Sequence, residues 1–176
     1  KIAGCDNIEF SNCLFEIKNE NDFGMDISGS SYAITISQSR FECINSKAGA
    51  INIGSDLNHD IMIADNTING SGAWGNTLVK AGGSAKNISI ERNDFERSFR
   101  AVYFIDTDTV SIYGNTIKNT NQGVYIDNQC TQVNISANRL INVQSYANLP
   151  DGTSGIFIQN STGVDVINNY VQSGGG

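Results

Sequence analysis

The sequence has little that would suit it to several common functions. Lysine and arginine together number 11 against 18 aspartates and glutamates, and this net charge of −7 disfavours a nucleic-acid partner. No apolar run is long enough to span a membrane, no signal peptide is recognisable, and helical spacing of apolar residues is absent. The only histidine, His59, lies between Asp56 and Asp60, which is too small a group to predict a metal site. No serine–histidine–aspartate order, P-loop or dinucleotide fingerprint occurs, so we predict no metal and no cofactor.

A short pattern recurs seven times instead. It consists of an apolar residue, a second two positions later, a small or polar residue at the fifth following position and a third apolar residue at the seventh. The copies start at Ile8, Ile34, Ile61, Ile88, Val110, Val133 and Val164. Fixed spacing within copies and variable spacing between them predict the coils of a parallel β-solenoid joined by loops.

A second pair of residues, again spaced by two, follows each of the first six copies and predicts another strand with one inward face. These pairs are Met25/Ile27, Ile51/Ile53, Leu78/Lys80, Val102/Phe104, Val124/Ile126 and Ile156/Ile158. Only Lys80 interrupts the apolar pattern, so we expect the third coil to be locally irregular.

The fifth following position holds asparagine in the last five copies. These residues are Asn66, Asn93, Asn115, Asn138 and Asn169. Because equivalent residues of a solenoid stack about 4.8 Å apart, we predict a buried asparagine ladder whose amides bond along the stack. Cys13 occupies this position in the first copy, and we expect it to be buried as well. The role of the row is structural.

The segments VSIYGNTIKNTNQGVYI (110–126) and VNISANRLINV (133–143) resemble the right-handed parallel β-helix of the pectate-lyase-like superfamily. That superfamily includes pectate and alginate lyases, polygalacturonases, mannuronan epimerases and phage tailspike depolymerases. The repeat and the resemblance together predict one all-β domain over residues 1–172, with about seven coils of three strands, and a glycine-rich tail at 173–176. The right-handed sense is implied by the resemblance alone, as is a polysaccharide or other glycan partner.

The four cysteines occupy different coil positions or lie far apart on the stack, which predicts free thiols. Free thiols favour folding in a reducing cytosol. The chain enters a coil almost at once and no capping helix is visible, so we expect a segment of a larger protein. Resemblance to tailspikes implies a homotrimer on a virion tail or extracellular surface.

Loop lengths predict where a ligand would bind. Nine residues separate the third apolar position from the next strand in coils one to three, six in coils four and five, and fifteen (141–155) in coil six. Short loops would leave a gap over coils four and five, about 14 Å wide, between a loop with Trp74 and one with Tyr146 and Asp151. Outward residues Tyr103, Tyr125 and Phe157 should form an aromatic column in this gap. Such a column could bind sugar rings or simply stabilise the sheet.

Charged residues beside this column suggest two kinds of chemistry. In a glycosidase, Glu96 would be the general acid and Asp151, across the gap, a second carboxylate. In a lyase or epimerase, Arg97, Arg100 or Lys118 would neutralise a uronate, while Tyr103 or Lys118 would move the C5 proton. Exposed charges on solenoid turns are also commonly there only for solvation.

A rival cluster of carboxylates is expected at another corner. Asp106, Asp108 and Asp127 follow the second strands of coils four and five, and clustered carboxylates resemble the polygalacturonase and tailspike style of hydrolase. They could equally be Asx-turn residues or a loose Ca²⁺ site. Two functions stay open: a polysaccharide-binding or polysaccharide-degrading segment, and a non-catalytic stalk or adhesin element.

Overall fold

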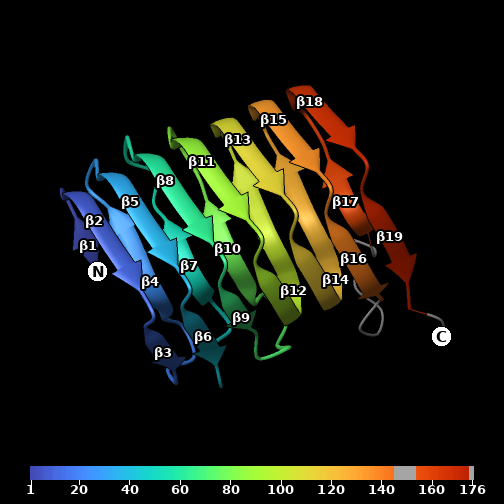
Figure 1. Ribbon diagram of the computed structural model, residues 1–176, viewed down its shortest axis with the longest axis horizontal. Coiled ribbons are helices and arrows are strands. Elements are labelled where there is room, and N and C mark those ends of the chain that lie inside the picture. The colour runs from blue at the N-terminus through green and yellow to red at the C-terminus, as the bar shows by residue number, and fades with distance from the viewer. Residues whose placement is uncertain (145–153, 175–176) are drawn as a thin grey trace.

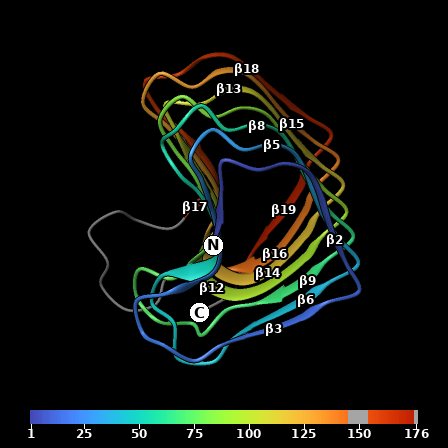
Figure 2. The ribbon, with the colours of Figure 1, turned by 90° about the vertical axis from the view of Figure 1, so that its left-hand side faces the viewer.

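The computed structural model describes residues 1–144 and 154–174, and every regular element in this part of the chain is a β-strand. Figure 1 shows the strands following one another along a single long axis, with the two termini at opposite ends. The view along this axis shows successive coils wound around a common interior (Figure 2). The predicted all-β parallel solenoid is therefore confirmed, while Tyr146 and Asp151 lie outside the described residues.

Three faces surround the interior. The first is a seven-stranded parallel sheet. Its strands are β2 (Asp6–Ser11), β5 (Tyr32–Ser37), β8 (His59–Ala64), β11 (Lys86–Glu91), β13 (Asp108–Tyr113), β15 (Thr131–Ser136) and β18 (Thr162–Ile167). Each strand pairs with its equivalents in the neighbouring coils, so that Ile34, for example, lies beside Ile61.

The second and third faces belong to one continuous 12-stranded sheet. The second face contains β3 (Leu14–Ile17), β6 (Arg40–Cys43), β9 (Thr67–Asn69), β16 (Arg139–Val143), β19 (Tyr170–Ser173) and the first halves of β12 (Asp94–Ile105) and β14 (Thr116–Asp127). The third face contains β1 (Ile2–Ala3), β4 (Phe23–Ser28), β7 (Gly49–Ile53), β10 (Thr77–Ala81), β17 (Ser154–Ile158) and the second halves of β12 and β14.

Strands β12 and β14 turn the corner between these faces without a loop. Each has one residue in the left-handed region at the bend, Arg97 with φ 58° and Asn119 with φ 53°. The stretches 96–101 and 118–123, predicted as short loops, are thus parts of strands. Hence no loop rises from these two coils at this corner.

Apolar side chains fill the interior in register. Ile36, Ile63 and Ile90 are fully or almost fully buried in successive coils, and Phe41 and Phe95 are also inaccessible. Burying a side chain of this size stabilises the fold by about 1.5–3 kcal/mol. The inward side chains of one coil become buried only because the neighbouring coils pack against them.

The asparagine ladder is present. The side-chain Nδ2 of Asn93 donates to Oδ1 of Asn115 at 3.1 Å and to the carbonyl of Ile63 at 2.9 Å. The main-chain N–H of Asn93 donates to the same Oδ1 at 2.9 Å. Asn66, Asn115 and Asn138 repeat these three bonds. The prediction that Asn93 and Asn115 are buried is confirmed, since each is only 1% exposed.

The residue immediately before the ladder position has a left-handed backbone in all seven coils. These residues are Asn12, Gln38, Asp65, Arg92, Gly114, Ala137 and Asn168, with φ between 48° and 65°. A left-handed backbone costs about 1–2 kcal/mol for a residue with a Cβ. The ladder bonds at the same corner offset this cost.

Two expectations about individual residues are wrong. Cys13 is partly exposed, because it lies in the first coil, which has a neighbouring coil on one side only among the described residues. Lys80 does not interrupt the interior, because Val79 pairs with Ile51 and Lys80 points outward. Strand β10 is therefore regular, with Val79 and Ala81 in the inward register and Leu78 near its start also fully buried in the core. All four cysteines are free thiols, as predicted.

Candidate functional site

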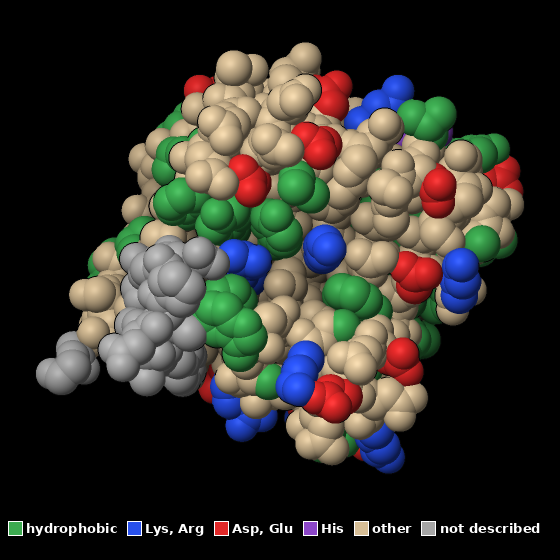
Figure 3. Space-filling model, turned by 180° about the vertical axis from the view of Figure 1, so that it is seen from behind, with side chains coloured by type: hydrophobic (Ala, Val, Ile, Leu, Met, Phe, Trp, Pro, Cys, Tyr) green, Lys and Arg blue, Asp and Glu red, His purple; other side chains and the backbone are tan. Residues whose placement is uncertain are grey.

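One outward row of side chains runs along the third face with one residue per coil. In order along the axis it contains Asp26, Asn52, Lys80, Tyr103, Tyr125 and Phe157. Viewed from behind, this face shows hydrophobic side chains next to lysine and arginine side chains (Figure 3). The predicted aromatic column therefore exists, and it continues into a polar stretch.

The rings of this column contact one another closely. The Tyr125 and Phe157 rings stack with centroids 4.6 Å apart, and Tyr103 meets Tyr125 edge-on at 5.3 Å. Tyr125 is only 9% exposed. Tyr125, in the middle of the column, is thus covered by its two neighbours and offers little of its ring face to a ligand.

Arg100 lies against the same rings. Its guanidinium carbon is 4.8 Å from the centroid of Tyr103 and 4.5 Å from that of Tyr125, and Nε donates to Oε1 of Gln122 at 2.6 Å. These are cation–π contacts. Burial raises the pKa of Tyr103, and the charge of Asp127 raises it further. Tyr103 is therefore protonated at neutral pH and is suited to donate a hydrogen bond rather than to act as a base.

Trp74 is the most accessible aromatic side chain near this row. It extends from the loop between β9 and β10, is 52% exposed and packs on Phe99 with centroids 4.5 Å apart. The guanidinium of Arg100 also lies over the Phe99 ring, with its carbon atom 4.8 Å from the ring centroid. Trp74, Arg100 and Tyr103 are linked through these contacts and through the Phe99 ring, which is itself buried, and we call the four side chains the aromatic strip.

The predicted catalytic residues are divided between two faces. Glu96 and Lys118 are paired in an outward row on the second face, whereas Arg100 belongs to the aromatic strip. Lys118 forms an ion pair with Asp94 at 3.0 Å, and Glu96 accepts a hydrogen bond from Asn119 at 3.2 Å. The pairing of Glu96 with Asp151 involves a residue outside the described part.

Arg97 and Glu96 line a small pocket on the second face. Its volume is about 150 Å³, and Asn69 completes its lining. Arg97 Nε donates to the carbonyl of Gly70 at 3.1 Å, which holds the side chain against the neighbouring coil. Arg97 therefore positions a loop in addition to carrying a charge at the surface.

The rival aspartates do not share one turn, because Asp106 lies in a bend after β12, whereas Asp108 and Asp127 belong to strands β13 and β14. Asp106 has a left-handed φ of 53°, Asp108 accepts a hydrogen bond from the hydroxyl of Thr131, and Asp127 accepts one from Gln159 at 2.7 Å. Within residues 1–144 and 154–174, no three histidine, cysteine, aspartate or glutamate side chains are grouped closely enough to hold a metal ion.

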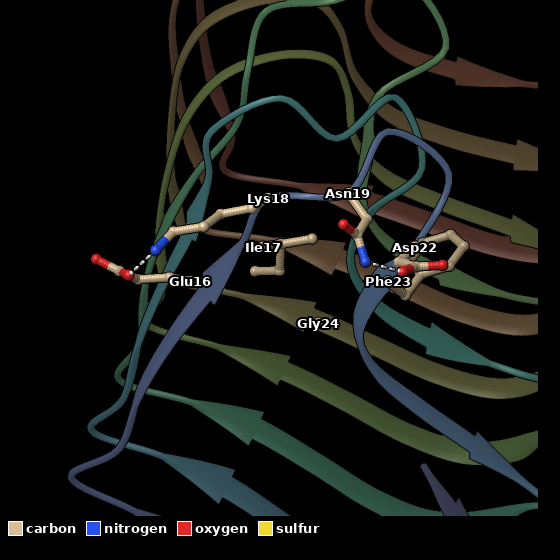
Figure 4. A pocket seen from close by; sticks show the side chains of 7 residues that line it. All are labelled: Glu16, Ile17, Lys18, Asn19, Asp22, Phe23 and Gly24. Atoms are coloured by element: carbon tan, nitrogen blue, oxygen red, sulfur yellow. Dashed lines mark hydrogen bonds and ion pairs between the residues drawn. The ribbon is translucent and has the colours of Figure 1, made fainter.

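Two further pockets carry no recognisable motif. One lies in the first coil, where Lys18 pairs with Glu16 at 2.9 Å and Asn19 donates to Asp22 at 2.7 Å (Figure 4). Lys18 lowers the pKa of Glu16 through its hydrogen bond and charge. The other, of about 380 Å³, includes Lys80. It escaped prediction because Lys80 was assigned to the interior.

Parallel coils, an internal asparagine ladder and an outward aromatic strip define a β-helix protein. The family described as "Right handed beta helix region" matches residues 59–176, so the chain belongs to this family. Its right-handed sense agrees with the prediction. Comparisons with curated proteins and with solved structures found no significant match. No membrane-spanning helix occurs in the described residues.

Proposed function

We propose that this β-helix binds an extended polysaccharide along its third face, over the aromatic strip. The observation that carries the proposal is the exposed ring of Trp74 beside Phe99, with the guanidinium of Arg100 alongside. Sugar rings present apolar C–H faces that pack on aromatic rings, and hydroxyls that accept hydrogen bonds from an arginine. The strip offers both kinds of contact.

The shape of this face supports an extended ligand. Coils four and five have continuous strands instead of loops at the corner, so no loop of these two coils covers the strip beside the Trp74 loop. Binding groups in successive coils are about 4.8 Å apart along the axis. A chain of several sugars could therefore contact several coils at once.

Cleavage of the bound polysaccharide is a further part of the proposal, as a hydrolase or a lyase. Glu96 is a carboxyl group that lines a pocket near the corner, and Lys118 is its neighbour in the same row. Against this role, Lys118 is paired with Asp94. Catalysis by this group would require the ion pair to open.

A non-catalytic stalk or adhesin element is the second candidate. It is favoured by the covered ring faces of Tyr125 and Phe157, which make this part of the column an internal support of the sheet. With the tailspike resemblance comes the proposal of a homotrimer on a virion tail or cell surface. Sedimentation of the intact protein as a stable monomer would contradict the trimer.

The proposal is tested by binding and product assays on one panel of bacterial surface and plant cell-wall polysaccharides. Calorimetry or a glycan array should reveal binding to at least one extended polysaccharide. New reducing ends would identify a hydrolase, and the ultraviolet absorbance of an unsaturated uronide would identify a lyase. Binding without products would leave an adhesin, and the absence of binding across the panel would favour the stalk.

A further inference from the structure

The pocket around Lys80 lies on the third face next to the aromatic strip. Two outward residues of the same row, Asn52 and Lys80, belong to its lining, and Tyr103 follows Lys80 in that row. The remaining lining residues are Ile53, Gly54, Ser55, Gly82, Gly83 and Ile105. A ligand lying along the strip would therefore reach the pocket one coil beyond Tyr103.

Two neighbouring coils approach closely at the rim of this pocket. Gly83 has a φ of +70°, and a Cβ atom at this position would meet the Cα, Cβ and carbonyl oxygen of Ser55 at 2.6 Å. The rim thus brings main chain of one coil against Ser55 of the next, and the Ile105 side chain lies beside Gly82. The pocket volume of about 380 Å³ leaves room for a compact polar group.

The charge of this pocket comes from a lysine that is not paired with a carboxylate within residues 1–144 and 154–174. Lys80 has no ion-pair partner among the described residues, whereas Lys18, Lys47 and Lys118 are each paired with a carboxylate. No aspartate or glutamate lines the pocket. Lys80 is the charged residue of this lining, and the carboxylate of Asp26 lies beyond Asn52 in the same row. A partly buried ammonium attracts an anion more strongly than one in bulk water does.

We propose that the pocket is an oxyanion subsite that accepts a carboxylate or sulfate substituent of the glycan bound on the aromatic strip. Lys80 supplies the charge and the Ser55 hydroxyl offers a hydrogen bond, while Nδ2 of Asn52 already donates to Oδ1 of Asp26 at 2.7 Å. The proposal rests on the proposed function, because the strip holds the sugar that carries the substituent. The subsite proposal adds that the preferred glycan is acidic, and it assigns this preference to Lys80.

The test uses an acidic oligosaccharide that the protein binds and its carboxyl-reduced, neutral counterpart. The unchanged protein should bind the acidic form about tenfold more tightly, which corresponds to about 1.4 kcal/mol, because the hydrogen bond from Lys80 is to a charged group. Lys80→Met should abolish this ratio, and Lys80→Arg should retain most of it. Lys86→Met is the matched control, since it removes the same charge from the first face, and it should leave the ratio unchanged.

A titration with sodium sulfate, followed by NMR of the Gly82 and Gly83 amides, tests the pocket without any glycan. Shifts that disappear in Lys80→Met would support it. Equal binding of the acidic and neutral sugars by the unchanged protein would overturn the subsite and leave the polysaccharide proposal standing. Sulfate shifts without binding of any glycan would overturn the glycan assignment and leave a site for a free oxyanion. The absence of both would overturn the subsite and the proposed function together.

Discussion

The asparagine ladder and the outward row of the third face both place one side chain per coil along the same axis. They differ in how many side-chain groups remain available to bind a ligand. In the ladder every amide is engaged, and Asn93 and Asn115 bond only to neighbouring coils. The outward row changes its chemistry from coil to coil, from Lys80 to Tyr103 to Phe157. Some side chains of this outward row still face solvent.

This difference separates residues that hold the solenoid together from residues that can recognise something else. Identical side chains in successive coils satisfy one another and have no capacity left for a ligand. A row with varied side chains cannot do so completely, and its least satisfied members are the candidates for binding. By this criterion Lys80 is a stronger candidate than Tyr125, which is largely buried, and the exposed Trp74 in the loop beside the row is a candidate as well.

The largest effect is expected inside the ladder. Asn115→Ala would remove the acceptor for two donors of Asn93 and leave the carbonyl of Ile90 without its partner. Because each buried unsatisfied group costs about 1–3 kcal/mol, the free energy of unfolding should fall by about 3 kcal/mol. Urea denaturation measures this change. Asn134→Ala, on the outer side of the first face, is the control and should change it by less than about 0.5 kcal/mol.

The next effect tests whether the middle of the aromatic column is structural. Tyr125→Ala removes a ring that stacks on Phe157 and lies under Arg100, so we expect a loss of about 2 kcal/mol in the free energy of unfolding. Tyr113→Ala is the control, because Tyr113 is outward and 47% exposed. If Tyr125→Ala lowered glycan affinity without lowering the urea midpoint, the buried ring would have to be counted as a binding residue.

A smaller effect is expected at the exposed end of the strip. Trp74→Ala should weaken polysaccharide binding about tenfold, which corresponds to about 1.4 kcal/mol, while the urea midpoint stays nearly constant. Calorimetry with the best ligand of the panel measures the affinity. Tyr170→Ala removes an equally exposed ring from the second face, and it should have no effect on binding. Equal losses in both variants would refute the assignment of the strip.

The smallest effect is expected at the cluster of Asp106, Asp108 and Asp127. In Asp127→Asn the side-chain oxygen can still accept the hydrogen bond from Gln159, so both folding and glycan affinity should change less than about twofold. Binding and product assays with the same ligand check this. A large loss of binding or activity in this variant would move the site from the strip to the three aspartates.

The sequence predicted the fold well because its repeat fixes which residues are equivalent. Asn66 to Asn169 stand at one offset from an apolar pair, and stacking then requires them to meet. The register of β10 was predicted wrongly because Leu78, Val79 and Ala81 are apolar at both parities of the strand. A one-residue shift of this kind moves every side chain of the strand to the opposite face.

The site was less predictable than the fold. The order of Tyr103, Tyr125 and Phe157 follows from the repeat, but the burial of Tyr125 depends on how rings and Arg100 pack against each other. Similarly, the contact of Trp74 with Phe99 joins a loop to the next coil, and no spacing rule describes it. The Lys80 pocket depends on main-chain approach at Gly83, which is visible only in three dimensions.

The bonds between coils also determine how the molecule would respond to mechanical force. The ladder bonds link residues 22, 23, 27 or 31 positions apart, so each coil leaves the stack as a separate length of chain. A pull on the C-terminus would act on one coil's bonds at a time and unwind the solenoid from that end. The released lengths would be unequal, and the order of long and short extensions in a force trace would record which coil had come away.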